Sequence, residues 1–153
     1  MPYYMTFFVN HASGATFADI EQGLRAEDQA YRVQVLERRP TDSFDSADLS
    51  YGDDEYARLE INRVGEQLFR GEIQDHLEAV EHGGKGQNSQ VAYTLRHANT
   101  ILRVHVLWGQ RDRDLTLDRL QPLWDWLFAY RWGVLHADGE GFYDSDGLIY
   151  EDR

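Results

Sequence analysis

The sequence predicts an α+β protein built on a mixed, largely antiparallel sheet. Two kinds of segment indicate this class. Some alternate apolar and polar side chains every second residue, as half-buried strands do, and others repeat apolar residues every three to four positions, as helices do. The segments begin in the order strand, helix, strand, strand, helix. We therefore expect a ferredoxin-like βαββαβ core, helices mainly on one face of the sheet, and a C-terminal helix and hairpin added to that core.

The first sixty residues show the pattern of three strands and one helix. Residues 3–9 are rich in aromatic and β-branched side chains, which predicts a strand. Thr16 can cap a short helix with one apolar face, and residues 31–37 alternate as a second strand. Residues 41–55 hold six acids and no base, which favours a loop. Residues 56–62 alternate again and predict the third strand.

The middle of the chain carries the clearest helical spacing. Residues 65–80 keep their apolar side chains on one helix face, and residues 82–89 form a glycine-rich break after them. Residues 91–98 predict a short helix, and residues 100–108 alternate as the most regular strand. Residues 115–132 form the most apolar helical segment, so most of its circumference should be buried.

The apolar helix contains a proline, which predicts an interruption. Pro122 lies too deep for a first turn, so we expect a short helical turn and a restart near Gln121. Gly133 is a plausible C-terminal stop, and residues 134–136 predict a short strand that follows it. The segment from residue 100 to residue 136 should then place its two strands parallel through a crossover.

An acidic segment near the C-terminus, residues 137–147, contains four carboxylates and three glycines. A calcium loop of the EF-hand type needs acids at its first, third and fifth positions, Gly at the sixth and Glu at the twelfth. Alignment on Gly147 leaves Phe142 first and Arg153 twelfth, which excludes that loop. Asp144–Gly147 instead has the composition of a hairpin turn between two short strands.

Length and composition limit the class of protein further. A chain of 153 residues with 42% hydrophobic and 13% aromatic content is most simply one globular domain. It has no Cys, which excludes disulfides and thiolate chemistry, and no apolar run near the roughly 18 residues of a membrane span. A net charge of −12 opposes nucleic acid and anionic membranes. These features predict a soluble cytoplasmic protein.

Familiar catalytic and cofactor motifs do not fit this sequence. The GGKG run at residues 83–86 follows a predicted helix rather than a strand and lacks the Lys-Ser/Thr ending of a phosphate loop. The six histidines include no pair spaced for a shared metal on one element, and there is no Gly-x-Ser-x-Gly nucleophile turn. We expect no cofactor and assign no catalytic or metal-binding residue.

The predicted strands carry a polar face opposite their apolar face. Because residues two apart in a strand point the same way, neighbouring strands would collect basic side chains with one Glu and one His on one side of the sheet. The candidate ligand-binding residues are Arg32, Arg58, Glu60, Arg103 and His105. Arg is suited to bidentate contacts with carboxylate or phosphate. The alternative is that these charges only form cross-strand ion pairs on a solvated face.

Two classes of function remain open from the sequence. The first is a non-catalytic binding or protein-interaction module, whose polar face takes a small anionic ligand or a protein partner, including a second copy of the chain. The second is a small metal- or carboxylate/His-dependent hydrolase built on Glu60, His105 and nearby acids. A closed pocket with His105 in hydrogen-bond reach of a carboxylate would favour the enzyme, and a flat face would favour the module.

Overall fold

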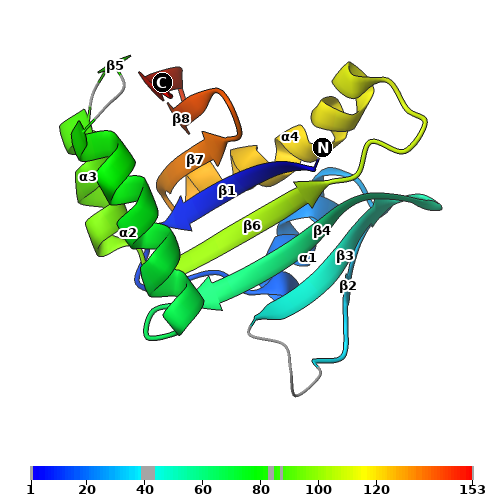
Figure 1. The fold of residues 1–153 in the computed structure, drawn as a ribbon. Coiled ribbons are helices and arrows are strands. Elements are labelled where there is room, and N and C mark those ends of the chain that lie inside the picture. Colours follow the sequence, from blue (N-terminus) through cyan, green and yellow to red (C-terminus); the bar gives the residue numbers. More distant parts are fainter. Residues whose placement is uncertain (1, 39–43, 83–84, 87, 153) are drawn as a thin grey trace.

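The computed structural model describes residues 2–38, 44–82, 85–86 and 88–152 (Figure 1). In this part of the chain nine strands form one sheet in the order β2-β3-β4-β6-β1-β7-β8-β9-β5, and all neighbouring strands are antiparallel. The strands are β1 (Tyr3–Val9), β2 (Tyr31–Val35), β3 (Asp45–Tyr51), β4 (Asp54–Arg63), β5 (Lys85–Gly86), β6 (Thr100–Val106), β7 (Gly133–Ala137), β8 (Gly141–Asp144) and β9 (Gly147–Glu151). The helices are α1 (Phe17–Glu27), α2 (Gln67–His82), α3 (Asn88–His97) and α4 (Arg113–Tyr130).

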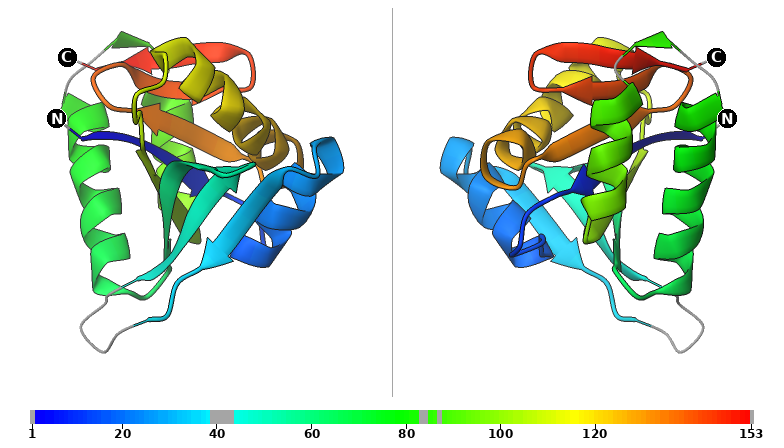
Figure 2. Two further views of the ribbon diagram at one scale, coloured as in Figure 1. Left: turned by 90° about the vertical axis from the view of Figure 1, so that its right-hand side faces the viewer. Right: turned by 90° about the vertical axis from the view of Figure 1, so that its left-hand side faces the viewer.

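The helices cover both faces of the sheet, two on each. Helices α1 and α4 enclose one hydrophobic core, and α2 and α3 enclose a second core on the opposite face (Figure 2). Adjacent residues of β1 divide between them, because Phe7 belongs to the first core and Phe8 to the second, and both are fully buried. The prediction that helices lie mainly on one face is therefore wrong, since the second face is apolar where α2 and α3 cover it.

The α+β class and the antiparallel sheet are confirmed, but the ferredoxin-like core is not. Strand β1 lies between β6 and β7, which α4 connects, so these elements form a split β-α-β unit. Strands β6 and β7 run parallel to each other, as expected, but they are not neighbours because both pair with β1. Three strands separate β1 from β2 in the sheet. Long-range pairing thus sets an order that local patterns do not specify.

Several local predictions are confirmed by backbone and cap geometry. Strand β1 has the predicted bounds, and the Thr16 side chain accepts a hydrogen bond from the backbone N–H of Asp19 at 3.1 Å, which caps α1. The C-terminal hairpin joins β8 to β9 with Asp144 opposite Gly147. The backbone N–H of Asp146 donates to Asp144 Oδ1 at 2.8 Å, the local bond expected of an Asp turn.

The acidic segment predicted as a loop at residues 41–55 is mostly strand, although residues 41–43 lie outside the described part. Strand β3 occupies Asp45–Tyr51, and β4 begins at Asp54. Its small and apolar residues, Ala47 and Leu49, are buried, while Asp48 between them lies on the other side. Asp45 pairs with Arg63 at 3.0 Å, which compensates its charge. The acid content of this segment suggested a loop, although its buried and exposed residues alternate as in a strand.

Helix α4 runs through Pro122 without the predicted break. Its buried face, which includes Leu120 and Leu123, keeps the segment against the sheet. This packing offsets the cost of about 3 kcal/mol that a proline brings to a helix interior. The helix ends at Tyr130 rather than at Gly133, which begins β7. A Cβ atom at Gly133 would lie 1.9 Å from the Phe8 carbonyl oxygen, so that position requires glycine.

Candidate functional site

Four of the five predicted site residues are direct neighbours on the sheet. Strands β4 and β6 pair so that Arg58 lies opposite His105 and Glu60 lies opposite Arg103. The strand register inferred from alternation is therefore confirmed for these two segments. The fifth residue, Arg32, is exposed on the edge strand β2, two strands away from β4, and lies outside this group.

Strand β1 completes the polar surface with a tyrosine. Tyr4 lies opposite His105 in the antiparallel ladder, and their ring centroids are 4.9 Å apart. The Arg103 guanidinium lies over the Tyr4 ring, 3.9 Å from its centroid, in a cation–π contact. We call Tyr4, Arg58, Glu60, Arg103 and His105 the polar strip.

The two arginines of the polar strip are in different electrostatic states. Arg58 Nε donates to Asp48 Oδ1 at 2.5 Å, so its charge is compensated by a neighbouring strand. Arg103 forms no hydrogen bond or ion pair with any residue that the structure describes, and tyrosine is its contact. Its donors are therefore free to bind another group.

Glu60 is the carboxylate beside Arg103, and burial weakens its acidity. Burial raises the pKa of Glu60 above its ordinary value, and this effect outweighs the opposing influence of Arg103 and Arg58. Glu60 and Glu72 of α2 both act on the Arg103 charge, but neither forms a hydrogen bond or ion pair with it among the described contacts.

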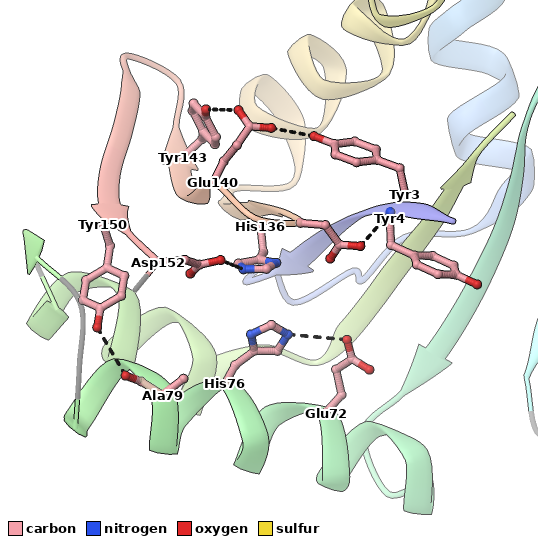
Figure 3. Close-up of polar contacts among 11 residues, drawn as sticks. Tyr3, Tyr4, Glu72, His76, Ala79, His136, Glu140, Tyr143, Tyr150 and Asp152 are labelled. Carbon is pink, nitrogen blue, oxygen red and sulfur yellow. Dashed lines mark hydrogen bonds and ion pairs between the residues drawn. The ribbon is translucent and has the colours of Figure 1, made fainter. Parts of the chain in front are cut away.

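Helix α2 places a second group of polar side chains on the same face of the sheet (Figure 3). His76 of α2 faces His136 of β7, with ring centroids 4.7 Å apart, and we call these two residues the histidine pair. His136 lies opposite Thr6 of β1, which in turn lies opposite Arg103, so the pair continues the row of residues from the polar strip.

Each ring of the histidine pair has a carboxylate partner. His136 is 9% exposed, and its Nε2 lies 2.9 Å from Asp152 Oδ2. His76 Nε2 lies 3.6 Å from Glu72 Oε1. Burial and the charge of His76 lower the pKa of His136, and the contact with His76 lowers the pKa of Glu72. His136 is therefore neutral at pH 7.

Sequence reasoning missed the histidine pair, although one of its residues left a signal. His76 and Glu72 fall at helical spacing among the apolar residues Phe69, Ile73 and Leu77, which is the pattern of the buried side of α2. A polar side chain in that position indicates a partner across the interface. The partner itself comes from β7 and was not identifiable before the strand order was known.

Two features on which the hydrolase hypothesis depended can be compared with the structure. Among the residues that the structure describes, no three His, Asp or Glu side chains are grouped closely enough to hold a metal ion. In the same part of the chain His105 has no hydrogen bond to a carboxylate and instead packs on Tyr4. None of the described helices has the combination of length and apolar character that a membrane crossing needs.

Comparisons with models of known protein families, with curated proteins and with solved structures found no match to this chain. Its function is therefore inferred from its own geometry. The fold and the site define an α+β protein whose antiparallel sheet is covered by helices on both faces. On one of these faces, a strip of basic, aromatic and carboxylate side chains has one arginine, Arg103, that forms no hydrogen bond or ion pair with a carboxylate among the described residues.

Proposed function

We propose that the chain is a non-catalytic binding module that holds an anionic group, a carboxylate or a phosphate, on its polar strip. The observation that carries this proposal is the position of Arg103, which is stacked on Tyr4 and forms no hydrogen bond or ion pair with a carboxylate among the described residues. A guanidinium presents paired N–H donors that match two oxygens of such a group.

The neighbours of Arg103 support an anionic ligand. Tyr4 fixes the plane of the guanidinium, which reduces the conformational freedom lost on binding. His105 lies two residues after Arg103 on β6 and opposite Tyr4 of β1, and its ring can donate a further hydrogen bond. Asp48 forms an ion pair with Arg58, whereas Glu60 and Glu72 act on the Arg103 charge without a hydrogen bond or ion pair to it, so Arg103 is the arginine of the strip with donors available for an added anion.

The anion can belong to a small molecule or to the side chain of a protein partner, including a second copy of this chain. The net charge of −12 repels anions at long range, but charges are screened beyond about 8 Å at physiological salt. Binding therefore depends on the close contacts of the strip. We expect it to weaken as ionic strength rises, because the contact is partly exposed to solvent.

Substitution of Arg103 tests this function. We expect Arg103→Gln to reduce binding of succinate or inorganic phosphate at least tenfold, because Gln keeps a polar side chain but loses the charge and the paired donors. NMR titration of the Arg103 side-chain N–H signal measures the wild-type affinity, and backbone amide shifts measure it in the variant.

Two control variants and a mass measurement complete the experiment. Arg70→Gln removes an exposed arginine from α2 and should leave binding unchanged, as should Arg32→Gln on the distant edge strand. Sedimentation of wild type and Arg103→Gln distinguishes a self-association surface from a small-molecule site. Equal anion affinity and equal solution mass for wild type and Arg103→Gln would contradict the proposal.

A small carboxylate/His-dependent hydrolase is the second candidate, favoured by the contact of His136 with Asp152 beside His76. Its candidate catalytic residues are then the histidine pair, in place of the His105 expected from the sequence. We expect no esterase activity above that of the His136→Gln variant if the module is the function. A loss of p-nitrophenyl acetate hydrolysis in His136→Gln, with its fold retained, would favour the hydrolase.

A further inference from the structure

A pocket of about 600 Å³ lies on the opposite face of the sheet from the polar strip. It is bounded by α4, by β1 and β7, and by the β8–β9 hairpin, whose strands follow β7 in the sheet. Adjacent residues of β1 separate the two sites, because Tyr3 lines this pocket and Tyr4 belongs to the polar strip (Figure 3). The volume falls within the roughly 300–1,000 Å³ of small-molecule sites.

The wall and the floor of the pocket are apolar and aromatic. Trp124 and Phe128 of α4 face Met5 of β1 and Leu135 of β7 across it. Trp124, Met5 and Leu135 are buried parts of the core, so this surface is fixed by packing. It suits the apolar body of a small organic ligand, for example an aromatic ring placed against Trp124 and Phe128.

Glu140 provides a carboxylate in a fixed orientation in the pocket lining. The Tyr3 hydroxyl donates to Glu140 Oε2 at 2.6 Å, and the Tyr143 hydroxyl donates to Oε1 at 2.7 Å (Figure 3). A carboxylate has about four acceptor positions, so two remain for a ligand. Burial and the bond to Glu140 raise the pKa of Tyr143 to about 12, and Tyr3 is shifted in the same direction, so both are neutral donors at pH 7.

The charge of the pocket has one sign. Among the described lining residues, the ionised side chains are Asp125, Glu140, Asp144 and Asp146, and none is basic. Arg113 lies 5.2 Å from the centroid of the Tyr3 ring and its charge helps to lower the pKa of Glu140, but it does not line the pocket. A cation is therefore the complementary ligand charge, and the aromatic rings add a second attraction for it.

We propose that this pocket binds a small organic ammonium ion with an apolar, ring-sized body. The ammonium donates to the free acceptor positions of Glu140, and the ring lies against Trp124 and Phe128. The site is independent of the polar strip, since the two lie on opposite faces of the sheet and take opposite charges.

Three compounds of the same size and different charge test the ligand class: 2-phenylethylamine, 2-phenylethanol and phenylacetate. Calorimetry at pH 7 should show the amine binding at least tenfold more tightly than the alcohol, with no saturable binding of the acid. Amide and methyl shifts in NMR spectra should place the amine beside Met5 and Ala137. Equal affinity for all three compounds, or shifts elsewhere on the surface, would overturn the proposal.

Variants of the carboxylate test the geometry. Glu140→Gln should weaken binding of 2-phenylethylamine at least tenfold, because it removes the negative charge. Tyr143→Phe should weaken binding several-fold, because loss of the Tyr143 hydroxyl lets the Glu140 carboxylate rotate without changing its charge. Glu78→Gln on α2 is the matched control, with the same change in net charge on the other face, and should bind as wild type does. An affinity unchanged in Glu140→Gln, or lowered equally in Glu78→Gln, would refute the site. Sedimentation that shows a dimer with a covered pocket, and the same dimer after 2-phenylethylamine is added, would also refute the proposal and assign the pocket to self-association.

Discussion

His136 shows, at the scale of a single residue, how burial controls a titratable side chain. Its ring lies between α2 and the sheet, beside His76 and in contact with Asp152. The protonated form would add a positive charge to a site that water reaches poorly, and His76 would repel it. The neutral ring carries no such penalty, so the folded state favours the uncharged form of His136.

The free energy of unfolding should therefore decrease as the pH falls from 7.5 to 5.5. The pKa of His136 is lower in the folded state than in the unfolded chain, so the unfolded chain binds the proton more readily. The stabilisation is complete above the ordinary histidine pKa near 6.5 and is lost below it, by at most about 1.4 kcal/mol per pH unit. The lowered pKa of Glu72 acts in the same direction at more acid pH.

Urea denaturation of wild type and His136→Gln across this window measures the effect. The variant should have a smaller dependence on pH, since Gln keeps a polar contact with Asp152 but does not titrate. His82→Gln, at the exposed end of α2, is the control and should retain the wild-type dependence. An identical slope in His136→Gln would show that His136 is not the group responsible.

At the scale of an element, α1 and α4 approach closely at a glycine. A Cβ atom added to Gly23 of α1 would lie 2.4 Å from Trp126 of α4, so the absence of a side chain there allows the two helices to pack. Gly71 of α2 has no neighbour within 4 Å of the same position. The two glycines therefore occupy helices for different reasons.

Alanine substitution should change stability in opposite directions at these two glycines. Gly23→Ala should lower the free energy of unfolding, because overpacking against Trp126 costs about 1–3 kcal/mol and exceeds the helix-propensity gain. Gly71→Ala should raise it by about 0.5–1 kcal/mol through helix propensity alone. Urea midpoints compare the two. Stabilisation by both changes would contradict the close contact of α1 with α4.

At the scale of the whole molecule, one sheet connects two hydrophobic cores. Phe7 and Phe8 of β1 are adjacent in the chain and fully buried on opposite faces. Strand β1 is also central, with β6 and β7 hydrogen-bonded to its two edges. Loss of one core should therefore destabilise the sheet on which the other depends, and we expect the chain to unfold as one domain.

Phe8→Ala tests this coupling. Removal of the ring from the α2–α3 core should lower the free energy of unfolding by about 3–5 kcal/mol. Trp124 and Trp126 lie on α4, across the sheet, so tryptophan fluorescence reports the other core. Its transition should shift together with that of far-UV circular dichroism, in one step. Tyr93→Ala, at an exposed position of α3, should shift neither signal appreciably.

If Phe8→Ala left the fluorescence transition at its wild-type urea concentration while part of the circular dichroism signal was lost at lower urea, the two cores would be independent folding units. That outcome would also contradict the single domain expected from the length of the chain.

The sequence by itself determined most of the local elements, with β3 and the continuity of α4 as exceptions, and the orientation of the side chains in the strands it identified. Alternation assigned Arg58 and Glu60 to the side of the sheet opposite the buried Leu59, because successive strand residues point to opposite faces. Thr16 and the Asp144–Gly147 turn marked a helix start and a hairpin through bonds within a few residues. Such features depend on neighbours in the chain and are present in the printed sequence.

Only the tertiary structure decided which of these surfaces meet. The position of β1 between β6 and β7, the facing rings of His76 and His136, and the bonds from Tyr3 and Tyr143 to Glu140 all join distant segments. Their partners are selected by long-range strand pairing and by the packing of two cores. Periodicity specifies which face of an element is apolar, but not which other element covers it.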